Sequence, residues 1–203
     1  LVGSEMCIRD SNNTTANSNT SIGYNSLVAN VTGAYNTAVG SFTLTDSTGG
    51  NYQVAVGYEA LNDNTTGTYN TAVGGRALDV NSTGSNNTAI GLNALGANST
   101  ADNNVAVGKN VLRLNTTGAY NTAIGFQSLQ VNTGSHYNTA VGYNALQDNV
   151  AHNNTAVGMT AGLNITTGTQ NVAIGSTAFQ SATTASQCVA IGYDALGDSN
   201  NAY

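Results

Sequence analysis

Asn36-Thr37-Ala38-Val39-Gly40 is one copy of a pentapeptide that recurs, with Val or Ile before the glycine, along almost the whole chain. Successive copies lie seventeen residues apart, except for one interval of sixteen residues between Gly142 and Gly158. A short strand-like peptide repeated at a fixed period is typical of a solenoid, in which each repeat forms one coil stacked on the previous one. The sequence therefore predicts an all-β protein, a parallel β-solenoid of about eleven 17-residue coils. The glycines that end the copies are expected to be structural, and they are Gly23, Gly40, Gly57, Gly74, Gly91, Gly108, Gly125, Gly142, Gly158, Gly175 and Gly192.

The repeat divides the 203-residue sequence into two unequal parts. Residues 1–11 match no phase of the repeat, so we interpret them as a non-repeat leader that is either a cap or a non-native addition. Residues 12–203 form the predicted repeat domain. Because the last residues begin a twelfth copy, we expect the sequence to be a fragment of a longer chain.

Charged residues are scarce: the chain has four Lys and Arg residues and a net charge of -6. Nucleic acids and anionic membrane surfaces are bound by clustered cations, so neither is an expected partner. No apolar run approaches the ~18 residues of a membrane-spanning helix. We therefore expect that the repeat itself does not span a membrane.

Three consecutive residues of each copy form the predicted strand. The residue before the glycine is always Val or Ile, and the residue two positions earlier is Thr or Val, as in Thr37 and Val39. Because alternate strand residues share a face, we predict that these two columns point into the coil. The residue between them, such as Ala38, is Ala in every copy but one, and it is predicted to face outward against a neighbouring subunit.

The return part of each coil carries a second apolar column and two columns of asparagine. Leu or Phe stands four residues after each glycine, except at Gly162. Asn recurs four residues before the glycine, as at Asn36, and seven residues after it, as at Asn64. Asn tolerates left-handed turns, and stacked Asn amides can hydrogen-bond from coil to coil. We expect two such ladders.

The usual residues of catalysis and metal binding are sparse. His136 and His152 are the only histidines, and no Cys or carboxylate stands near them at ligand spacing. Asp46 and Asp63 share a phase in adjacent coils and could lie close, but other coils have Val or Ala there, so we do not predict a metal. No nucleophilic triad or phosphate-binding loop is present. We expect a protein that is not an enzyme and has no cofactor.

Aromatic residues are the main candidates for binding. They occupy two phases, one five residues before the glycine and one directly after it, which other copies fill with Asn, Gln, Ser or Lys. Such mixed columns indicate a partly exposed surface that binds sugars or proteins, caps the coil edges, or fills a subunit interface. The first column contains Tyr35, Tyr52, Tyr69, Tyr120 and Tyr137, and the second contains Tyr24, Tyr58, Phe126, Tyr143 and Tyr193.

Residues 171–175 (NVAIG) and 188–192 (CVAIG) resemble the head repeats of YadA-like trimeric autotransporter adhesins, whose motif is Asn-Ser-Val-Ala-Ile-Gly. Related repeats occur in phage tail fibres and microbial surface proteins. The resemblance covers the chain from about residue 19 onward. It implies a left-handed β-roll, a side-by-side homotrimer, and an extracellular location on a bacterial cell surface. The period here is longer than the usual head repeat, and the stalk, neck and anchor of that family do not occur in this sequence.

Three functions are compatible with these features. The first is an extracellular adhesin or fibre head that attaches to a host surface protein, matrix or glycan. The second is a structural spacer within a surface fibre or phage tail fibre, for which replacement of the Tyr columns would leave binding unchanged. The third is an ice-binding solenoid, which is less favoured because the Thr column is predicted to face inward.

Overall fold

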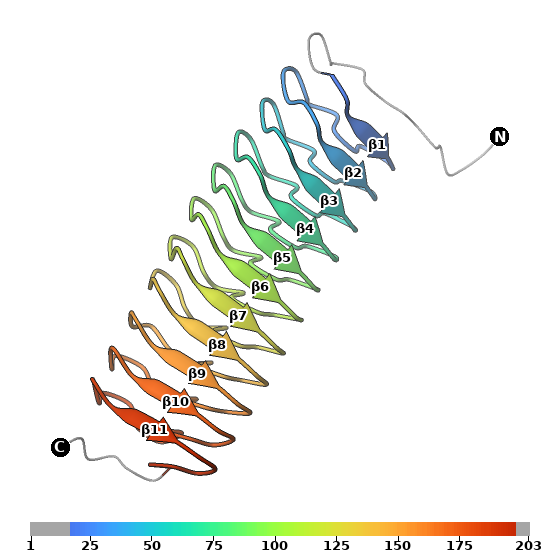
Figure 1. Ribbon diagram of the computed structural model, residues 1–203. Coiled ribbons are helices and arrows are strands. Elements are labelled where there is room, and N and C mark those ends of the chain that lie inside the picture. Colours follow the sequence, from blue (N-terminus) through green and yellow to red (C-terminus); the bar gives the residue numbers. More distant parts are fainter. Residues whose placement is uncertain (1–16, 198–203) are drawn as a thin grey trace.

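The computed structural model describes residues 17–197 of the chain, so the predicted leader at residues 1–11 lies outside the described residues. The fold is all-β, as predicted, and consists of short strands stacked into one long, narrow solenoid (Figure 1). Within residues 17–197 there is no helix with the length and apolarity needed to cross a membrane. The strands are β1 (Thr20–Ile22), β2 (Thr37–Val39), β3 (Val54–Val56), β4 (Thr71–Val73), β5 (Thr88–Ile90), β6 (Val105–Val107), β7 (Thr122–Ile124), β8 (Thr139–Val141), β9 (Thr155–Val157), β10 (Val172–Ile174) and β11 (Val189–Ile191).

All eleven strands form a single parallel sheet in sequence order, β1 to β11. Equivalent residues of neighbouring copies pair directly, so Thr37 lies beside Val54 and Ala38 beside Ala55. The short interval does not shift the register, because Thr139 pairs with Thr155 in the same way. Each 17-residue period is therefore one coil, and every repeat position becomes a continuous column along the stack.

The glycine at the end of each strand is required by both backbone conformation and space. Gly74 has a φ of +133°, in a region that L side chains rarely adopt. A Cβ at Gly74 would also lie 2.7 Å from the carbonyl carbon of Gly91 in the next coil. Both constraints exclude a side chain at this position.

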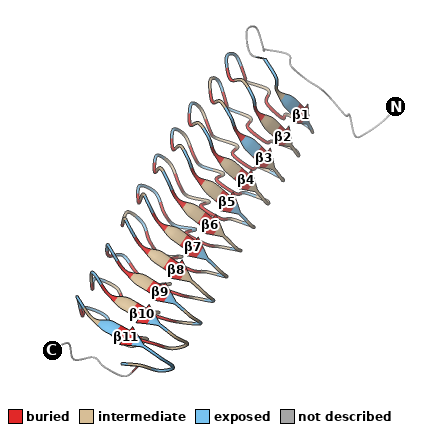
Figure 2. Cartoon of the chain, in the orientation of Figure 1, coloured by how far each residue is buried: buried red, intermediate tan, exposed pale blue. Residues whose placement is uncertain are grey.

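The interior of the coil reverses the predicted orientation of the strand. Ala38 is fully buried, whereas its neighbours Thr37 and Val39 are only half-buried, and every strand repeats this order (Figure 2). The Ala column packs inside against the Leu column of the return segment, as represented by Leu44. The prediction that Val/Ile and Thr/Val fill the coil was wrong. A coil this narrow accommodates one Leu and small side chains, so the β-branched residues face outward.

The Leu column depends on a backbone conformation that the sequence did not indicate. Leu44, Leu61 and Leu78 have φ values of 49°, 52° and 51°, in the left-handed region that non-glycine residues seldom occupy. All three are fully buried. The buried Leu side chains offset the backbone cost at this sharp bend, which returns the chain toward the next strand.

Two columns of buried Asn hold successive coils together, as predicted. In the first, the Oδ1 atom of Asn87 accepts the backbone N–H of Asn104 at 3.0 Å, and the Nδ2 atom of Asn87 donates to the Ala101 carbonyl at 2.8 Å. In the second, the Nδ2 atom of Asn98 donates to the Oδ1 atom of Asn81 at 2.9 Å. The first column thus pairs mainly with backbone groups and the second also with neighbouring amides, inside a coil that has little room for apolar side chains.

The coil that follows the short interval shows how the core adapts when the Leu column is interrupted. Gly162 occupies the Leu position, and Ile165 replaces Asn in the second Asn column. Ile165 is buried, and a Cβ at Gly162 would lie 3.0 Å from the Ile165 Cδ1 atom and 2.9 Å from the Leu146 Cδ2 atom. Ile165 therefore fills the volume that a Leu side chain fills in the other coils.

Candidate functional site

The outer side of the sheet carries four columns of side chains that the strand geometry brings onto one surface. In the coil around Gly57, Tyr52, Val54 and Tyr58 are exposed and Val56 is half-buried, while the alternating residues Gln53 and Ala55 are fully buried. We call the surface formed by these four positions in all coils the strand face. It contains both predicted Tyr columns and also the Thr/Val and Val/Ile columns that were expected inside.

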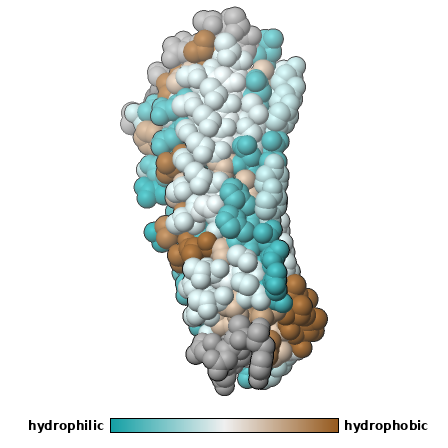
Figure 3. Space-filling view, turned by 90° about the vertical axis from the view of Figure 1, so that its left-hand side faces the viewer, coloured by the Kyte–Doolittle hydropathy of each residue, from teal (hydrophilic) through white to brown (hydrophobic). Residues whose placement is uncertain are grey.

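The two central columns of the strand face consist of β-branched residues along its whole length, Thr or Val in one and Val or Ile in the other. Ten steps of about 4.8 Å make it roughly 50 Å long, and its central two columns lie about 7 Å apart. The exposed fraction of Ile90 and of Ile124 is 40%, which is large for a residue within a sheet. One side of the stack is seen in Figure 3, where hydrophilic residues form a band and a second group along one margin, and separate hydrophobic clusters lie midway and near one end. Exposed Val, Ile and Tyr side chains aligned over this length are typical of an interaction site.

The first Tyr column forms ladders in which ring faces cover one another. The Tyr35 and Tyr52 rings are stacked with centroids 4.9 Å apart, and Tyr52 and Tyr69 follow at 5.0 Å. Tyr120 and Tyr137 form a second stack at 5.1 Å. Since sugars pack on open aromatic faces, these ladders offer mainly ring edges and hydroxyl groups to a ligand.

The second aromatic column is less regular and includes a residue that the sequence did not single out. Phe42 lies between Tyr24 and Tyr58, with edge-on ring contacts of 5.3 and 6.1 Å. Phe126 and Tyr143 stack at 5.5 Å. Phe42 stands one position later than the column, so a search by repeat phase alone omits it.

Tyr193 belongs to the second column and is the most exposed aromatic residue described, with 82% of its surface accessible. No ring stacking involving it is seen within residues 17–197.

The two histidines lie together and serve the coil backbone. The His136 and His152 rings stack with centroids 5.3 Å apart. The Nδ1 atom of His136 accepts the Ala119 backbone N–H at 2.9 Å, and the Nδ1 atom of His152 accepts the His136 backbone N–H at 3.0 Å. Both histidines therefore act as turn residues that accept hydrogen bonds from backbone N–H groups of the preceding coil.

Acidic residues gather on the return segments of the first coils, where Asp46 and Asp63 are close enough to interact. Burial, followed by the charge of Asp46, raises the pKa of Asp63. Burial and then the charges of Glu59 and Asp63 raise the pKa of Asp79 to about 6, while Arg76 opposes the shift. In the described part of the chain, no group of three or more His, Cys, Asp or Glu side chains is placed to hold a metal ion.

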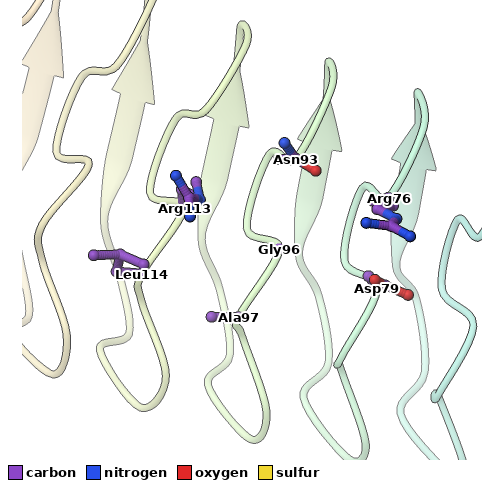
Figure 4. Close-up of a pocket in the computed structure, with 7 residues that line it drawn as sticks. All are labelled: Arg76, Asp79, Asn93, Gly96, Ala97, Arg113 and Leu114. Atoms are coloured by element: carbon purple, nitrogen blue, oxygen red, sulfur yellow. The ribbon is translucent and has the colours of Figure 1, made fainter.

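A hollow of about 300 Å³ opens on the return side of the stack beside this acidic group (Figure 4). Arg76 and Arg113 lie on either side of Asn93, and Asp79 lies below Arg76. Gly96, Ala97 and Leu114 complete the lining. Sequence reasoning missed this hollow because its polar residues come from different phases of the repeat and different coils.

Comparison of the chain with protein-family models, curated proteins and solved structures gives no match.

Proposed function

We propose that this chain is a non-enzymatic attachment module, the head of an extracellular adhesin or fibre that displays a repetitive surface to a host surface protein, matrix or glycan. The observation that supports it best is the strand face, in which two continuous columns of β-branched residues are flanked by interrupted columns of aromatic residues on an eleven-stranded parallel sheet. The resemblance of the repeats to those of YadA-like trimeric autotransporter adhesins supports the same function. A location on the bacterial cell surface follows from that resemblance.

In this proposal three copies of the chain pack side by side through their strand faces. The strand face is long and exposes Val, Ile and Tyr side chains, whereas the interior of most coils holds one Leu, small residues and Asn. Burial of apolar surface contributes about 25 cal/mol per Å², so covering the strand face would supply stability that the narrow interior lacks. The Tyr ladders at one margin of the face would then lie near the edge of the interface, where amphipathic side chains are common.

Attachment is tested by measuring the binding of the full chain to an immobilised panel of matrix proteins and of neutral and acidic glycans. The variant carries Tyr52→Asn and Tyr69→Asn, because Asn86 and Asn103 show that the same column accepts Asn. We expect saturable binding by the unaltered chain and weaker binding by the variant to any ligand that contacts the ladder. A chain that binds nothing on the panel would favour the alternative, a structural spacer of a surface fibre or phage tail fibre.

Ice binding is a second candidate because the orientation of the strands removes the objection raised from the sequence. Thr71, Thr88 and Thr122 point outward in one column, beside an outward column of Val and Ile. Regular Thr and Val rows on a flat parallel sheet are the surface that ice-binding solenoids use. Thermal hysteresis of a dilute solution of the full chain tests this function: measurable hysteresis that Thr88→Tyr abolishes would favour it over the adhesin, and none would exclude it.

A further inference from the structure

The hollow on the return side exists because one coil carries small residues where its neighbours carry long ones. Gly96 and Ala97 stand at the phases occupied by Asp79 and Val80 in the preceding coil, and by Arg113 and Leu114 in the following coil. The resulting gap is about 300 Å³, the lower end of the range for small-ligand sites. Ala97 and Leu114 give it an apolar wall.

Two of the three Lys and Arg residues of the described chain line this hollow. Arg76 and Arg113 lie on the first and third of three consecutive coils, whereas Lys109 lies outside the hollow. The Arg76 Nε atom pairs with a Glu59 carboxylate oxygen at 2.6 Å, the single ion pair within residues 17–197. The exposed Arg113 guanidinium is therefore available to a ligand, and its paired N–H groups match a carboxylate.

The other polar groups of the hollow suit hydroxyl groups. The Asn93 Nδ2 atom donates to the Asn110 Oδ1 atom at 3.2 Å, which leaves the Asn93 Oδ1 atom as an acceptor beside the hollow. The Asp79 carboxyl group is half-buried and lines the opposite part of the hollow. A ligand that offers one carboxylate, several hydroxyl donors and a compact apolar ring edge would satisfy all of these groups.

We propose that this hollow binds a single carboxylate-bearing sugar residue, such as a uronic acid within an acidic glycan, with Arg113 holding the carboxylate. The sugar hydroxyl groups donate to Asn93 and Asp79, and the ring lies against Ala97 and Leu114. The choice of a sugar rests on the proposed attachment function. The hollow lies on the return segments, away from the strand face. Ligand binding in the hollow and assembly of the chains through the strand face can therefore be measured separately.

The test is calorimetric titration of the full chain with tri-galacturonate, with its methyl ester as the uncharged control ligand. We expect saturable binding of the acid and at least roughly tenfold weaker binding of the ester, because the charge-assisted bond to Arg113 is lost. Arg113→Gln is expected to weaken binding of the acid by about the same factor. Lys109→Gln makes the same change in net charge outside the hollow, and its affinity is expected to stay within about twofold of the unaltered chain.

A second variant fills the hollow without altering charge. A Cβ at Gly96 would come no closer than 3.4 Å to a neighbouring atom, the Asn93 carbonyl oxygen, and Gln130 and Gln147 occupy the same phase in other coils. Gly96→Gln should therefore fold normally and abolish binding. If Gly96→Gln and Arg113→Gln bind tri-galacturonate as the unaltered chain does, or if the methyl ester binds equally well, the assignment of this site is wrong.

The ionisation of Asp79 supplies an independent readout. Glu59, Asp63 and Arg76 act on its carboxyl group, and the Arg113 guanidinium faces it across the hollow. An ionised Asp79 repels the ligand carboxylate, so affinity should be about fivefold higher at pH 5.5 than at pH 7.5. Tri-glutamate tests the class of ligand: tighter binding of this peptide than of the sugar acid would replace the saccharide assignment with an acidic peptide. If none of the three ligands binds while the chain still binds the panel of matrix proteins and glycans, the hollow is not a binding site and the proposed attachment function is unaffected.

Discussion

The central alanine of each strand is the residue at which the prediction from the sequence differs most from the structure. Ala38 and Val39 are adjacent, and hydropathy alone favours burying the valine. The constraint comes from the opposite wall, where Leu44 fills the coil and leaves space only for a methyl group. The period, the strands, the structural glycines and the Asn ladders could be predicted because each is a local property repeated in every coil. Which strand residues point into the coil could not be predicted, because that depends on the width of the closed coil.

Two adjacent substitutions in β5 test this orientation. Ala89→Val adds two methyl groups inside the coil, where Ala89 is fully buried, and should destabilise the protein by about 1–3 kcal/mol. Ile90→Val removes one methylene from a side chain that is 40% exposed and should cost less than about 0.5 kcal/mol in the single chain. Urea denaturation followed by far-UV circular dichroism gives both values. If Ile90→Val destabilised the protein more than Ala89→Val, the Val/Ile column would point into the coil.

The raised pKa of Asp79 makes its contribution to the stability of the folded chain decrease as the pH rises. Its pKa in the folded chain is raised to about 6 from 3.8, so between these values the folded state binds more protons than the unfolded state. The contribution of Asp79 to stability is therefore fully present below about pH 4 and is lost as the pH rises through about 6. We expect Asp79→Asn to gain stability at pH 7.5 relative to the unaltered chain, on the order of 1 kcal/mol because solvent screens the half-buried group.

Thermal melting of both proteins at pH 4 and pH 7.5 checks this prediction. The difference in Tm should be larger at pH 7.5 than at pH 4. An equal difference at both pH values would mean that the Asp79 carboxyl group is not perturbed in the folded chain.

At the scale of the element, the coil between Gly158 and Gly175 shows that one coil can exchange the roles of two columns. Gly162→Leu alone would drive a side chain against Leu146 and Ile165, and Ile165→Asn alone would leave part of the interior empty. Together the two changes recreate the Leu and Asn arrangement of the other coils. We expect each single variant to lose about 1–4 kcal/mol and the double variant to lose less than the sum.

Denaturation of the two single variants and the double variant gives the coupling energy directly. The account requires a favourable coupling of about 1 kcal/mol or more between the two sites. Additive losses would mean that Ile165 does not occupy the volume left by the missing Leu.

The same element scale explains which candidate sites could be found from the sequence. The Tyr columns were visible because they keep one phase, although their mutual stacking was not. The hollow combines Asp79, Asn93 and Arg113 from two phases and three coils, and it becomes visible only when the coils are stacked. Departures from the repeat are therefore as informative about binding as the repeated residues themselves.

For the whole molecule, the strand face is the feature that most requires a partner. The account predicts that cations placed in the middle of this face separate the copies. Ile90→Lys combined with Ile124→Lys is the test, and Val150→Lys is the matched control, since all three side chains are 40% exposed in the single chain. The double variant should dissociate, or unfold on dissociation, whereas the control should keep the mass of the unaltered chain.

The most direct test of the central claim is the solution mass of the full, unaltered chain, measured by light scattering over a concentration series. The account predicts a stable particle of three chains, each of 20.5 kDa. A folded particle with the mass of one chain at every concentration would contradict it, because the strand face would then be stable in water without a second copy.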